Sequence, residues 1–174
     1  MKDFLLFILL AVAVVVPFRL FIAQPFVVHG ESMLPTFTEG EYLIIDQLSY
    51  RLGEPARGDV IVFRSPPDPS QFYIKRIIGL PGETVTVDGE RVTIESAEGS
   101  FVLEDGLTGG TTLGYTRRTL ADDEYFVMGD NRPRSSDSRV WGALSRDNIM
   151  GRAVLRLLPL SDAGLNPGAE RVTP

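Results

Sequence analysis

The chain opens with an apolar stretch that differs from everything after it. Residues Phe4 to Ala23 are apolar apart from Arg19. Their number matches the roughly twenty residues with which a helix crosses a bilayer at about 1.5 Å rise per residue. Pro17 and Arg19 lie near the outer end, where a proline is tolerated and a long cation reaches the interface. We therefore predict a transmembrane anchor within residues 1–24.

Two other interpretations of this stretch are weighed. A cleaved secretory signal would suit Lys2 and the short apolar run, but Phe21-Ile22-Ala23 places a phenylalanine where cleavage needs a small residue. A buried core helix fits the length, yet nothing in the stretch is amphipathic. Lys2 and the amino terminus oppose Arg19 beyond the span, so the positive-inside bias toward an internal amino terminus is slight.

Beyond the anchor, the hydrophobic pattern is that of short strands. Short β-branched or aromatic runs are bounded by turn residues. These runs are Tyr42 to Ile45, Val60 to Arg64, Phe72 to Ile78, Tyr125 to Met128 and Ala153 to Leu158. Two further runs, Thr84 to Val87 and Glu90 to Ile94, flank Asp88-Gly89, which predicts a hairpin with a type I′ turn. Outside the anchor, helical turns are expected only around Pro35 and Ser145.

These patterns predict a mainly β fold, in which one transmembrane helix precedes an antiparallel β-sheet domain at residues 25–160. Residues 96–121 are Gly-rich and poorly patterned, which predicts a loop-rich excursion within that domain. Residues 161–174 are small and polar with Gly and Pro, which predicts a flexible tail. A chain of 174 residues is long enough for one such domain with its own core.

Composition and charge exclude several functional classes. The formal net charge of −6 argues against nucleic acid as a partner, because phosphate binding needs clustered Lys and Arg. The absence of cysteine excludes disulfides, thiol catalysis and thiolate metal sites. The single histidine, His29, excludes sites that need two imidazoles. Because the acidic residues lack ligand spacing, we expect no metal and no organic cofactor.

Three segments carry candidate chemistry. In the first, Gly30 to Thr36, Ser32 lies between a flexible glycine and a rigid proline, which suits a nucleophile on a tight turn. A helix cap is the alternative for this serine. In the second, Lys75 shares a strand face with Tyr73 and Ile77. Such a lysine is poorly hydrated, which lowers its pKa toward that of a general base. A lysine snorkelling at a sheet edge is the alternative.

The third segment is a polar loop from Gly129 to Gly142, with serines, an acid and arginines closed by a lone tryptophan. Loops of this kind that lie over a sheet often carry function. Asp137 and Arg139 are suited to pair and hold the loop, and a serine hydroxyl is suited to orient the amine of a base. A solvated loop without function is the alternative.

Together, and in this order behind an apolar anchor, these segments resemble the bacterial type I signal peptidase family. The resemblance covers nearly the whole chain. It rests on four boxes, namely Gly30 to Thr36, Gly58 to Phe63, Tyr73 to Glu83, and Gly129 to Gly142. The region between the last two boxes is short and is similar to that of the compact Gram-positive form. A single box arises by chance, whereas four with consistent spacing do not.

The resemblance implies a serine/lysine endopeptidase that removes signal peptides with small residues before the cut from exported preproteins. It implies a single-pass protein of the bacterial cytoplasmic membrane, with the catalytic domain on the translocated side of the lipid bilayer. By position, Ser32 is the nucleophile and its N–H donates to the oxyanion, while Lys75 is the general base. Ser135 matches the serine that fixes the lysine amine, and Asp137 and Arg139 match a supporting ion pair.

One departure from the family concerns the oxyanion. Some members carry a serine two residues before the nucleophile, whereas this chain has Gly30 there, so the second donor is left open between a backbone group and water. We assign no role to Pro133 or Arg134. We expect the substrate to pair as an extended strand beside the nucleophile segment or the lysine strand. Substrate contacts are assigned to Met33, Pro35, Tyr73 and Ile74.

Other bases and other functions are less consistent with the sequence. His29 lies three residues from Ser32, but its position is not catalytic in the resembling proteins, and the presence of Lys75 argues against the related peptidases that use a histidine base. A self-cleaving transcriptional repressor would need a DNA-binding helical domain and no anchor. A catalytically inactive assembly factor for pili or surface proteins should have lost Ser32 or Lys75, and both are present.

Overall fold

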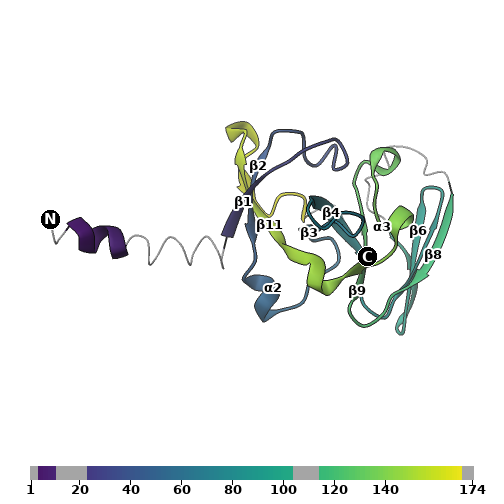
Figure 1. Ribbon diagram of the computed structural model, residues 1–174. Coiled ribbons are helices and arrows are strands. Elements are labelled where there is room, and N and C mark those ends of the chain that lie inside the picture. Colours follow the sequence, from purple (N-terminus) through teal and green to yellow (C-terminus); the bar gives the residue numbers. More distant parts are fainter. Residues whose placement is uncertain (1–3, 11–22, 104–113, 170–174) are drawn as a thin grey trace.

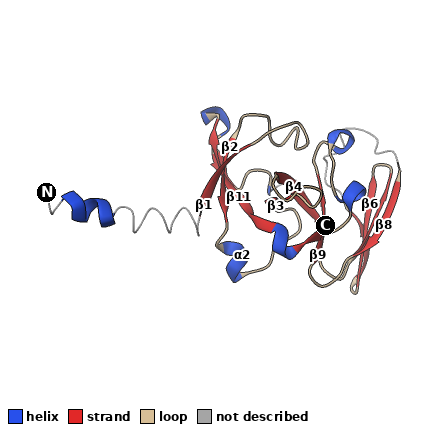
Figure 2. Cartoon of the chain, in the orientation of Figure 1, coloured by secondary structure: helices blue, strands red, loops and turns tan. Residues whose placement is uncertain are grey.

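The structure is a computed structural model that describes residues 4–10, 23–103 and 114–169. Its strands form two antiparallel sheets (Figures 1 and 2). The larger sheet has the order β1-β2-β11-β3-β4-β9-β10, with β12 paired to β11, and the smaller has the order β7-β6-β5-β8. The strands are β1 (Ala23–Val27), β2 (Tyr42–Asp46), β3 (Val60–Arg64), β4 (Phe72–Gly79), β5 (Thr84–Asp88), β6 (Arg91–Ser96), β7 (Gly99–Val102), β8 (Tyr115–Thr119), β9 (Glu124–Met128), β10 (Leu144–Ser145), β11 (Ile149–Leu158) and β12 (Gly164–Leu165).

The predicted mainly β, antiparallel architecture is confirmed. β2, β3, β4 and β9 begin and end within one residue of the predicted runs, and β11 begins four residues before Ala153. The strand β1 was not predicted, because it follows directly on the apolar stretch and contains Pro25. Proline is confined largely to edge strands, and β1 is the first strand of its sheet.

Alternating side chains on β3 join two layers of core. Val60 and Val62 pack on one face with Met33, Phe37 and residues of β2. Ile61 and Phe63 pack on the other face, with residues of β4 and β9. Because both faces are covered, β3 is buried along nearly its whole length. The central part of the large sheet is therefore a rigid layer between two packed cores.

The predicted hairpin forms, but its turn differs from the prediction. Asp88 pairs with Arg91, so the two turn residues are Gly89 and Glu90. A type I′ turn needs positive φ at both central residues, whereas here only Gly89 has it, at 58°. Positive φ at the first central residue alone is the pattern of a type II′ turn. The predicted turn type was therefore wrong, and the turn lies one residue later in the chain than predicted.

The excursion predicted for residues 96–121 contains two strands. β7 pairs with β6 and β8 pairs with β5, which completes the smaller sheet. Both strands are largely exposed, so they lack the alternating apolar pattern that would predict them. The middle of the excursion, residues 104–113, lies outside the described residues.

The segment predicted to be a flexible tail is structured up to residue 169. It contains a 3₁₀ turn, η3 (Leu160–Asp162), and β12, whose residues Gly164 and Leu165 pair with Arg156 and Leu155. In the predicted anchor, residues 4–10 are helical and residues 11–22 lie outside the described residues. Within the part of the chain that the structure describes, none of the helices is long and apolar enough to cross a membrane.

Besides η3, four short helical elements lie in the connections between the described strands. They are α2 (Ser49–Leu52), η1 (Arg132–Arg134), α3 (Ser138–Trp141) and η2 (Arg146–Asn148). The turn expected near Ser145 corresponds to η2, and residues 32–36 near Pro35 form turns. The helix α3 begins where the Asp137 carboxylate accepts a hydrogen bond from the Arg139 N–H. It places Trp141 against Phe63, with ring centroids 5.9 Å apart.

Among the described residues, the open strand edges of the large sheet include those of β1 and of the first half of β4. β4 pairs with β3 over Phe72 to Arg76, but with β9 only from Arg76 onward. The edge of Phe72 to Lys75 that faces away from β3 has no strand beside it among residues 4–10, 23–103 and 114–169. Within the same ranges β1 pairs with β2 alone. Backbone donors and acceptors on these edges are available to an added strand.

The contact between the two sheets depends on Gly79. A Cβ at this position would collide with Val85 of β5 and would lie 2.9 Å from Leu120. Gly79→Ala should therefore destabilise the protein by about 1–3 kcal/mol through overpacking. The free energy of unfolding in urea measures this. Gly53→Ala is the matched control, because its nearest neighbour is 3.6 Å away, and it should change stability by less than about 0.5 kcal/mol. Equal effects of the two variants would contradict the close sheet contact.

Candidate active site

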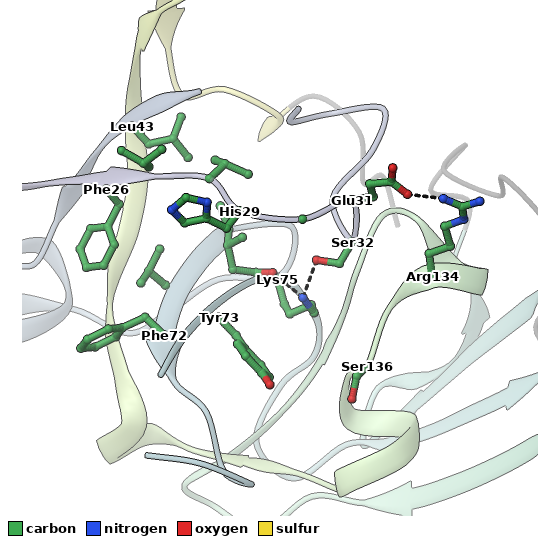
Figure 3. A pocket seen from close by; sticks show the side chains of 15 residues that line it. Phe26, His29, Glu31, Ser32, Leu43, Phe72, Tyr73, Lys75, Arg134 and Ser136 are labelled. Atoms are coloured by element: carbon green, nitrogen blue, oxygen red, sulfur yellow. Dashed lines mark hydrogen bonds and ion pairs between the residues drawn. The ribbon is translucent and has the colours of Figure 1, made fainter. Parts of the chain in front are cut away.

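Ser32 and Lys75 meet although 43 positions separate them in the sequence. The Lys75 Nζ donates to Ser32 Oγ at 2.7 Å and to the Ile74 carbonyl at 2.8 Å. Figure 3 shows the two side chains directed toward each other across the pocket. Ser32 lies in the turns that follow β1, and Lys75 lies on β4. The distance is within hydrogen-bond reach, as a nucleophile and its base require.

The amine of Lys75 is held out of solvent. The residue is 4% exposed, and its Nζ lies 5.5 Å from the centroid of the Tyr73 ring. Burial lowers the pKa of Lys75 to about 8, against the opposing effect of the Asp137 and Asp130 carboxylates; the nearby Arg139 lowers it further. At a pKa of about 8, roughly one amine in ten is neutral at pH 7, against about one in 2,500 for an ordinary lysine. The expected dehydrated lysine on β4 is thus present.

The polar loop after β9 holds the nucleophile segment by its backbone. The Asn131 N–H donates to the Ser32 carbonyl at 3.0 Å, and the Asn131 side chain donates to the Glu31 carbonyl at 2.9 Å. Gly129 permits this approach, because a Cβ there would collide with the Ser32 carbonyl oxygen. Arg134 forms an ion pair with Glu31 (Figure 3). These links were not foreseen, since an asparagine beside a loop carries no sequence signal for a distant carbonyl.

Asp137 and Arg139 form the expected ion pair, in a two-pronged geometry. Arg139 Nε donates to Oδ1 of Asp137 and its Nη2 to Oδ2, each at 2.7 Å. Asp137 is fully buried, and it also accepts from the Gly129 N–H at 3.0 Å. Arg139 further donates to the Arg132 carbonyl at 2.8 Å. The pair therefore fixes both ends of the loop that carries Asn131.

The structure does not show the expected contact of Ser135 with the lysine amine. The Ser135 Oγ is buried without a hydrogen-bond partner, and it lies against Gly129. Lys75 donates instead to the carbonyl of its neighbour Ile74, which lies on the same strand. The correspondence by position brought Ser135 near the site, but the direction of a hydroxyl cannot be read from spacing.

A second buried ion pair lies next to the dyad and was missed. Arg76 is completely buried and binds Asp130 through two bonds of 2.8 and 2.6 Å. Asp130 also accepts from the Thr36 hydroxyl at 2.5 Å. Arg76 follows Lys75 on β4, so its side chain projects to the opposite face of the sheet. An arginine inside an apolar strand run is the signal that could have predicted a buried acidic partner.

A largely apolar pocket of about 300 Å³ opens beside the dyad. The end of β1 and the residues after it form one wall, and the start of β4 forms the other (Figure 3). The lining residues are Phe26, Val27, Val28, His29, Gly30, Glu31, Ser32, Leu43, Val62, Phe72, Tyr73, Ile74, Lys75, Arg134 and Ser136. The pocket thus lies between the two open strand edges of the large sheet.

Two of the four predicted substrate contacts line this pocket, and two do not. Tyr73 and Ile74 lie on its wall, whereas Met33 and Pro35 are not part of the lining. Met33 is 1% exposed and packs in the core with Phe37, because the turn after Ser32 directs it inward. The side chain of Met33 is therefore not available to a substrate, whereas Pro35 is exposed and its assignment stays a prediction.

Two other residues considered from the sequence also line the pocket. Gly30 has a φ of +82°, a left-handed conformation that glycine adopts readily. The imidazole of His29 lies on the Phe26 side of the pocket, while the Lys75 amine contacts the Ser32 hydroxyl (Figure 3). In the described part of the chain, no group of three or more His, Asp or Glu residues is arranged to hold a metal ion.

The loop's buried ion pair should be essential for stability. Asp137→Ala leaves the Arg139 guanidinium without its carboxylate and the Gly129 N–H without its acceptor, so it should cost about 3–5 kcal/mol. Unfolding in urea measures the loss. The matched control is Glu95→Ala, which removes an exposed two-pronged pair with Arg117 and should cost about 1 kcal/mol or less. A small loss for Asp137→Ala would contradict the structural role of the pair.

Comparison with known proteins places this site in a family. A family model described as signal peptidase, peptidase S26, matches residues 1–158. The chain is 38% identical to a signal peptidase I of Leptolyngbya laminosa, over 89% of this chain and 78% of that protein. It is also 38% identical to a signal peptidase I of Bacillus caldolyticus, over 86% and 87% of the two chains. A crystal structure of a signal peptidase I from Enterococcus faecalis is 33% identical, with a TM-score of 0.49, over 59% of this chain and 98% of that one. The family model and the two sequence relatives show that the chain belongs to the signal peptidase family of peptidases.

Proposed function

We propose that this peptidase is a type I signal peptidase that removes N-terminal signal peptides from exported preproteins, with Ser32 as nucleophile and Lys75 as general base. Peptidase activity follows from membership of the family, and its relatives are named signal peptidase I. The observation that carries the mechanism is the 2.7 Å contact between the buried Lys75 amine and the Ser32 hydroxyl.

In the first step, neutral Lys75 takes the proton from Ser32 Oγ as that oxygen attacks the scissile carbonyl. The tetrahedral oxyanion accepts a hydrogen bond from the Ser32 N–H. The second donor is a backbone group or water, since Gly30 has no hydroxyl. The ammonium of Lys75 then protonates the leaving amine, which leaves an acyl ester on Ser32. Lys75 next takes a proton from water, whose oxygen attacks the ester. As the bond from the acyl carbon to Ser32 Oγ breaks, Lys75 returns that proton to Oγ, which releases the new carboxyl end and restores the hydroxyl and the neutral amine.

The surroundings of Lys75 suit both of its charge states. Burial favours the neutral amine that accepts the proton, while the Ile74 carbonyl accepts a hydrogen bond from Nζ in either state. The carboxylates of Asp137 and Asp130 favour the ammonium that forms during the reaction. A pKa near the working pH is what an efficient acid–base catalyst requires.

The substrate lies as an extended strand between the two open edges. Phe72 to Lys75 of β4 and the residues after β1 supply backbone groups along the pocket, so a peptide placed there gains strand pairing as well as side-chain contacts. A pocket of about 300 Å³ whose wall includes Tyr73 and Ile74 suits small side chains at the first and third positions before the cut.

The membrane positions the enzyme near its substrates. The apolar stretch Phe4 to Ala23 serves as the single anchor, and the domain at residues 25–160 lies on the translocated side of the bacterial cytoplasmic membrane. About nine residues separate Ala23 from Ser32, so the nucleophile lies within roughly 30 Å of the lipid surface. A signal peptide held in the bilayer is then within reach of the site.

Removing either member of the dyad should abolish processing. Ser32→Ala and Lys75→Met should each lower the kcat for cleavage of a preprotein by about a thousandfold or more, because the two groups act as one unit. Processing by detergent-solubilised protein, followed by gel shift, measures this. Survival of substantial processing in either variant would exclude the serine/lysine mechanism, and an inactive wild type would favour an assembly factor instead.

Although it abolishes activity, Lys75→Met should make the protein more stable. Lys75→Met replaces a buried amine by an apolar chain of similar length, so at pH 7 it should gain up to about 3 kcal/mol. The folded pKa of Lys75, about 8, lies below its ordinary value of 10.5. Between these values the unfolded chain binds the proton that the folded chain has released, so wild-type stability rises with pH. The advantage of Lys75→Met should therefore be full below pH 8 and shrink toward pH 10.5 in unfolding experiments. A constant advantage across this range would contradict the lowered pKa.

Activity should follow the loss of the Lys75 proton. Below the pKa of about 8, kcat/KM should rise tenfold per pH unit, and above it the rate should level off. A pH–rate profile with one preprotein between pH 5.5 and pH 10 measures this. A profile that is flat across this range, or that reaches half of its plateau below pH 5.5, would exclude Lys75 as the base.

A further inference from the structure

The last described part of the chain, residues 159–169, lies beyond the region that the family model matches. It turns at η3, pairs with β11 through β12, and continues with an Asn166 N–H that donates to the Val154 carbonyl at 2.8 Å. Two residues later, the Gly168 carbonyl accepts a hydrogen bond of 2.6 Å from Nη1 of Arg76. We call residues 159–169 the C-terminal segment. It therefore reaches from the edge of the domain to the strand that carries Lys75.

The guanidinium that it contacts is completely buried. Its Nε and Nη2 bind the two oxygens of Asp130, and its Nη1 is shared by the carbonyls of Gly58 and Gly168. Arginine is always charged at these sites and its donors are fixed in a planar fork, so each acceptor also fixes the orientation of the group. If the Gly168 carbonyl moved away, Nη1 would keep the Gly58 carbonyl and lose the second of these two acceptors. The C-terminal segment thus completes the coordination of Arg76.

From Arg76 the contacts lead directly to the dyad. Asp130, which is bound by Arg76, accepts a hydrogen bond from the hydroxyl of Thr36, four residues beyond Ser32. The residue after Asp130, Asn131, donates its N–H to the Ser32 carbonyl at 3.0 Å. Arg76 itself is joined by one peptide bond to Lys75. One buried guanidinium therefore links the backbone of the nucleophile to the strand of the base.

The fit at position 168 requires glycine. Gly168 has a φ of +83°, a conformation that side chains disfavour. A Cβ built there would lie 2.8 Å from Thr36 Cγ2, 3.1 Å from Arg76 Nη2 and 3.5 Å from Val60 Cγ2. Any side chain would thus push the segment away from the two residues that tie Ser32 and Lys75 together.

We propose that the C-terminal segment is a positioning element of the active site, in which Gly168 docks on Arg76 and Thr36 and holds Ser32 and Lys75 at reacting distance. This inference rests on the proposed function. Gly168 touches no reacting atom and acts through Arg76 and Asp130. The substrate pocket is formed by other residues, so loss of the docking affects the rate of the chemical step and leaves substrate binding unchanged.

The test uses the full chain and cleavage of one preprotein well below the melting temperature of every variant. Gly168→Val should lower kcat by about 10–100-fold with KM nearly unchanged, the size expected when reacting groups shift by a fraction of an ångström to one ångström. Gly164→Val is the matched control, because it lies in the same segment and a Cβ there meets nothing within 4 Å. It should retain the wild-type kcat and KM.

A rescue experiment separates docking from general stability. Gly168→Ala should lower kcat less than valine does, and Thr36→Ser removes the methyl group nearest to the new Cβ while keeping the hydroxyl that binds Asp130. The loss of kcat caused by Gly168→Ala should therefore be several-fold smaller in the Thr36→Ser background than in the wild type. This comparison decides the case even where Gly168→Val fails to fold.

The outcomes distinguish the inference from the proposed function. A wild type that does not process the preprotein overturns the proposed function. An active wild type in which the Gly168 variants keep their kcat, or lose only melting temperature, overturns the positioning role. A rise in KM without a fall in kcat, or equal losses from Gly168→Ala in both Thr36 backgrounds, overturns it as well.

Discussion

The arrangement of this site depends on removing one lysine amine from water. Dehydration of Lys75 is the main cause of its lowered pKa, and it is achieved by a strand whose neighbouring residues cover the amine. The same burial raises the free energy of the folded state, since a charged amine is stabilised by water that the fold excludes. The protein therefore needs strong packing around β4. That packing comes from the two core layers on either side of the large sheet.

The two buried carboxylates near the amine would oppose this effect if they stood alone. Asp137 and Asp130 each favour the charged lysine, yet each is bound by an arginine in two-pronged geometry. The guanidinium of Arg139 lowers the pKa of Lys75 in turn. Asp137 can therefore bind backbone N–H groups around the site, and Asp130 can bind the Thr36 hydroxyl, while the pKa of Lys75 stays lowered. Buried ion pairs are weak sources of net stability, but here they fix geometry.

Strand alternation lets β4 serve two purposes at adjacent positions. Lys75 projects to one face, where it meets Ser32, and Arg76 projects to the other, where it meets Asp130. The loop of Asp130 and Asn131 then returns to the nucleophile segment. The position of Lys75 is thus coupled to that of Ser32 through backbone hydrogen bonds and a buried ion pair.

The sequence predicted the parts of this structure that local pattern controls. Runs such as Val60 to Arg64 alternate between two buried faces, so their strands could be located within a residue. The exposed strand β8 has no such pattern, and β1 contains a proline that local rules count against a strand. Ser32 and Lys75 were identified through motifs in order along the chain. The directions of Ser135 and Met33, by contrast, follow from tertiary packing that no local pattern encodes.

The open edges of β1 and β4 make sense only together with the dyad. Unpaired strand edges beside an apolar pocket are a hazard, because they invite pairing with other chains. In this fold the edge of Phe72 to Lys75 ends at the residue that carries the amine, and the wall opposite ends at Ser32. A chain that paired with these edges would therefore be held in extended form beside Ser32. The same features that weaken the fold, a dehydrated lysine and incomplete sheet edges, therefore meet at the pocket that Ser32 lines.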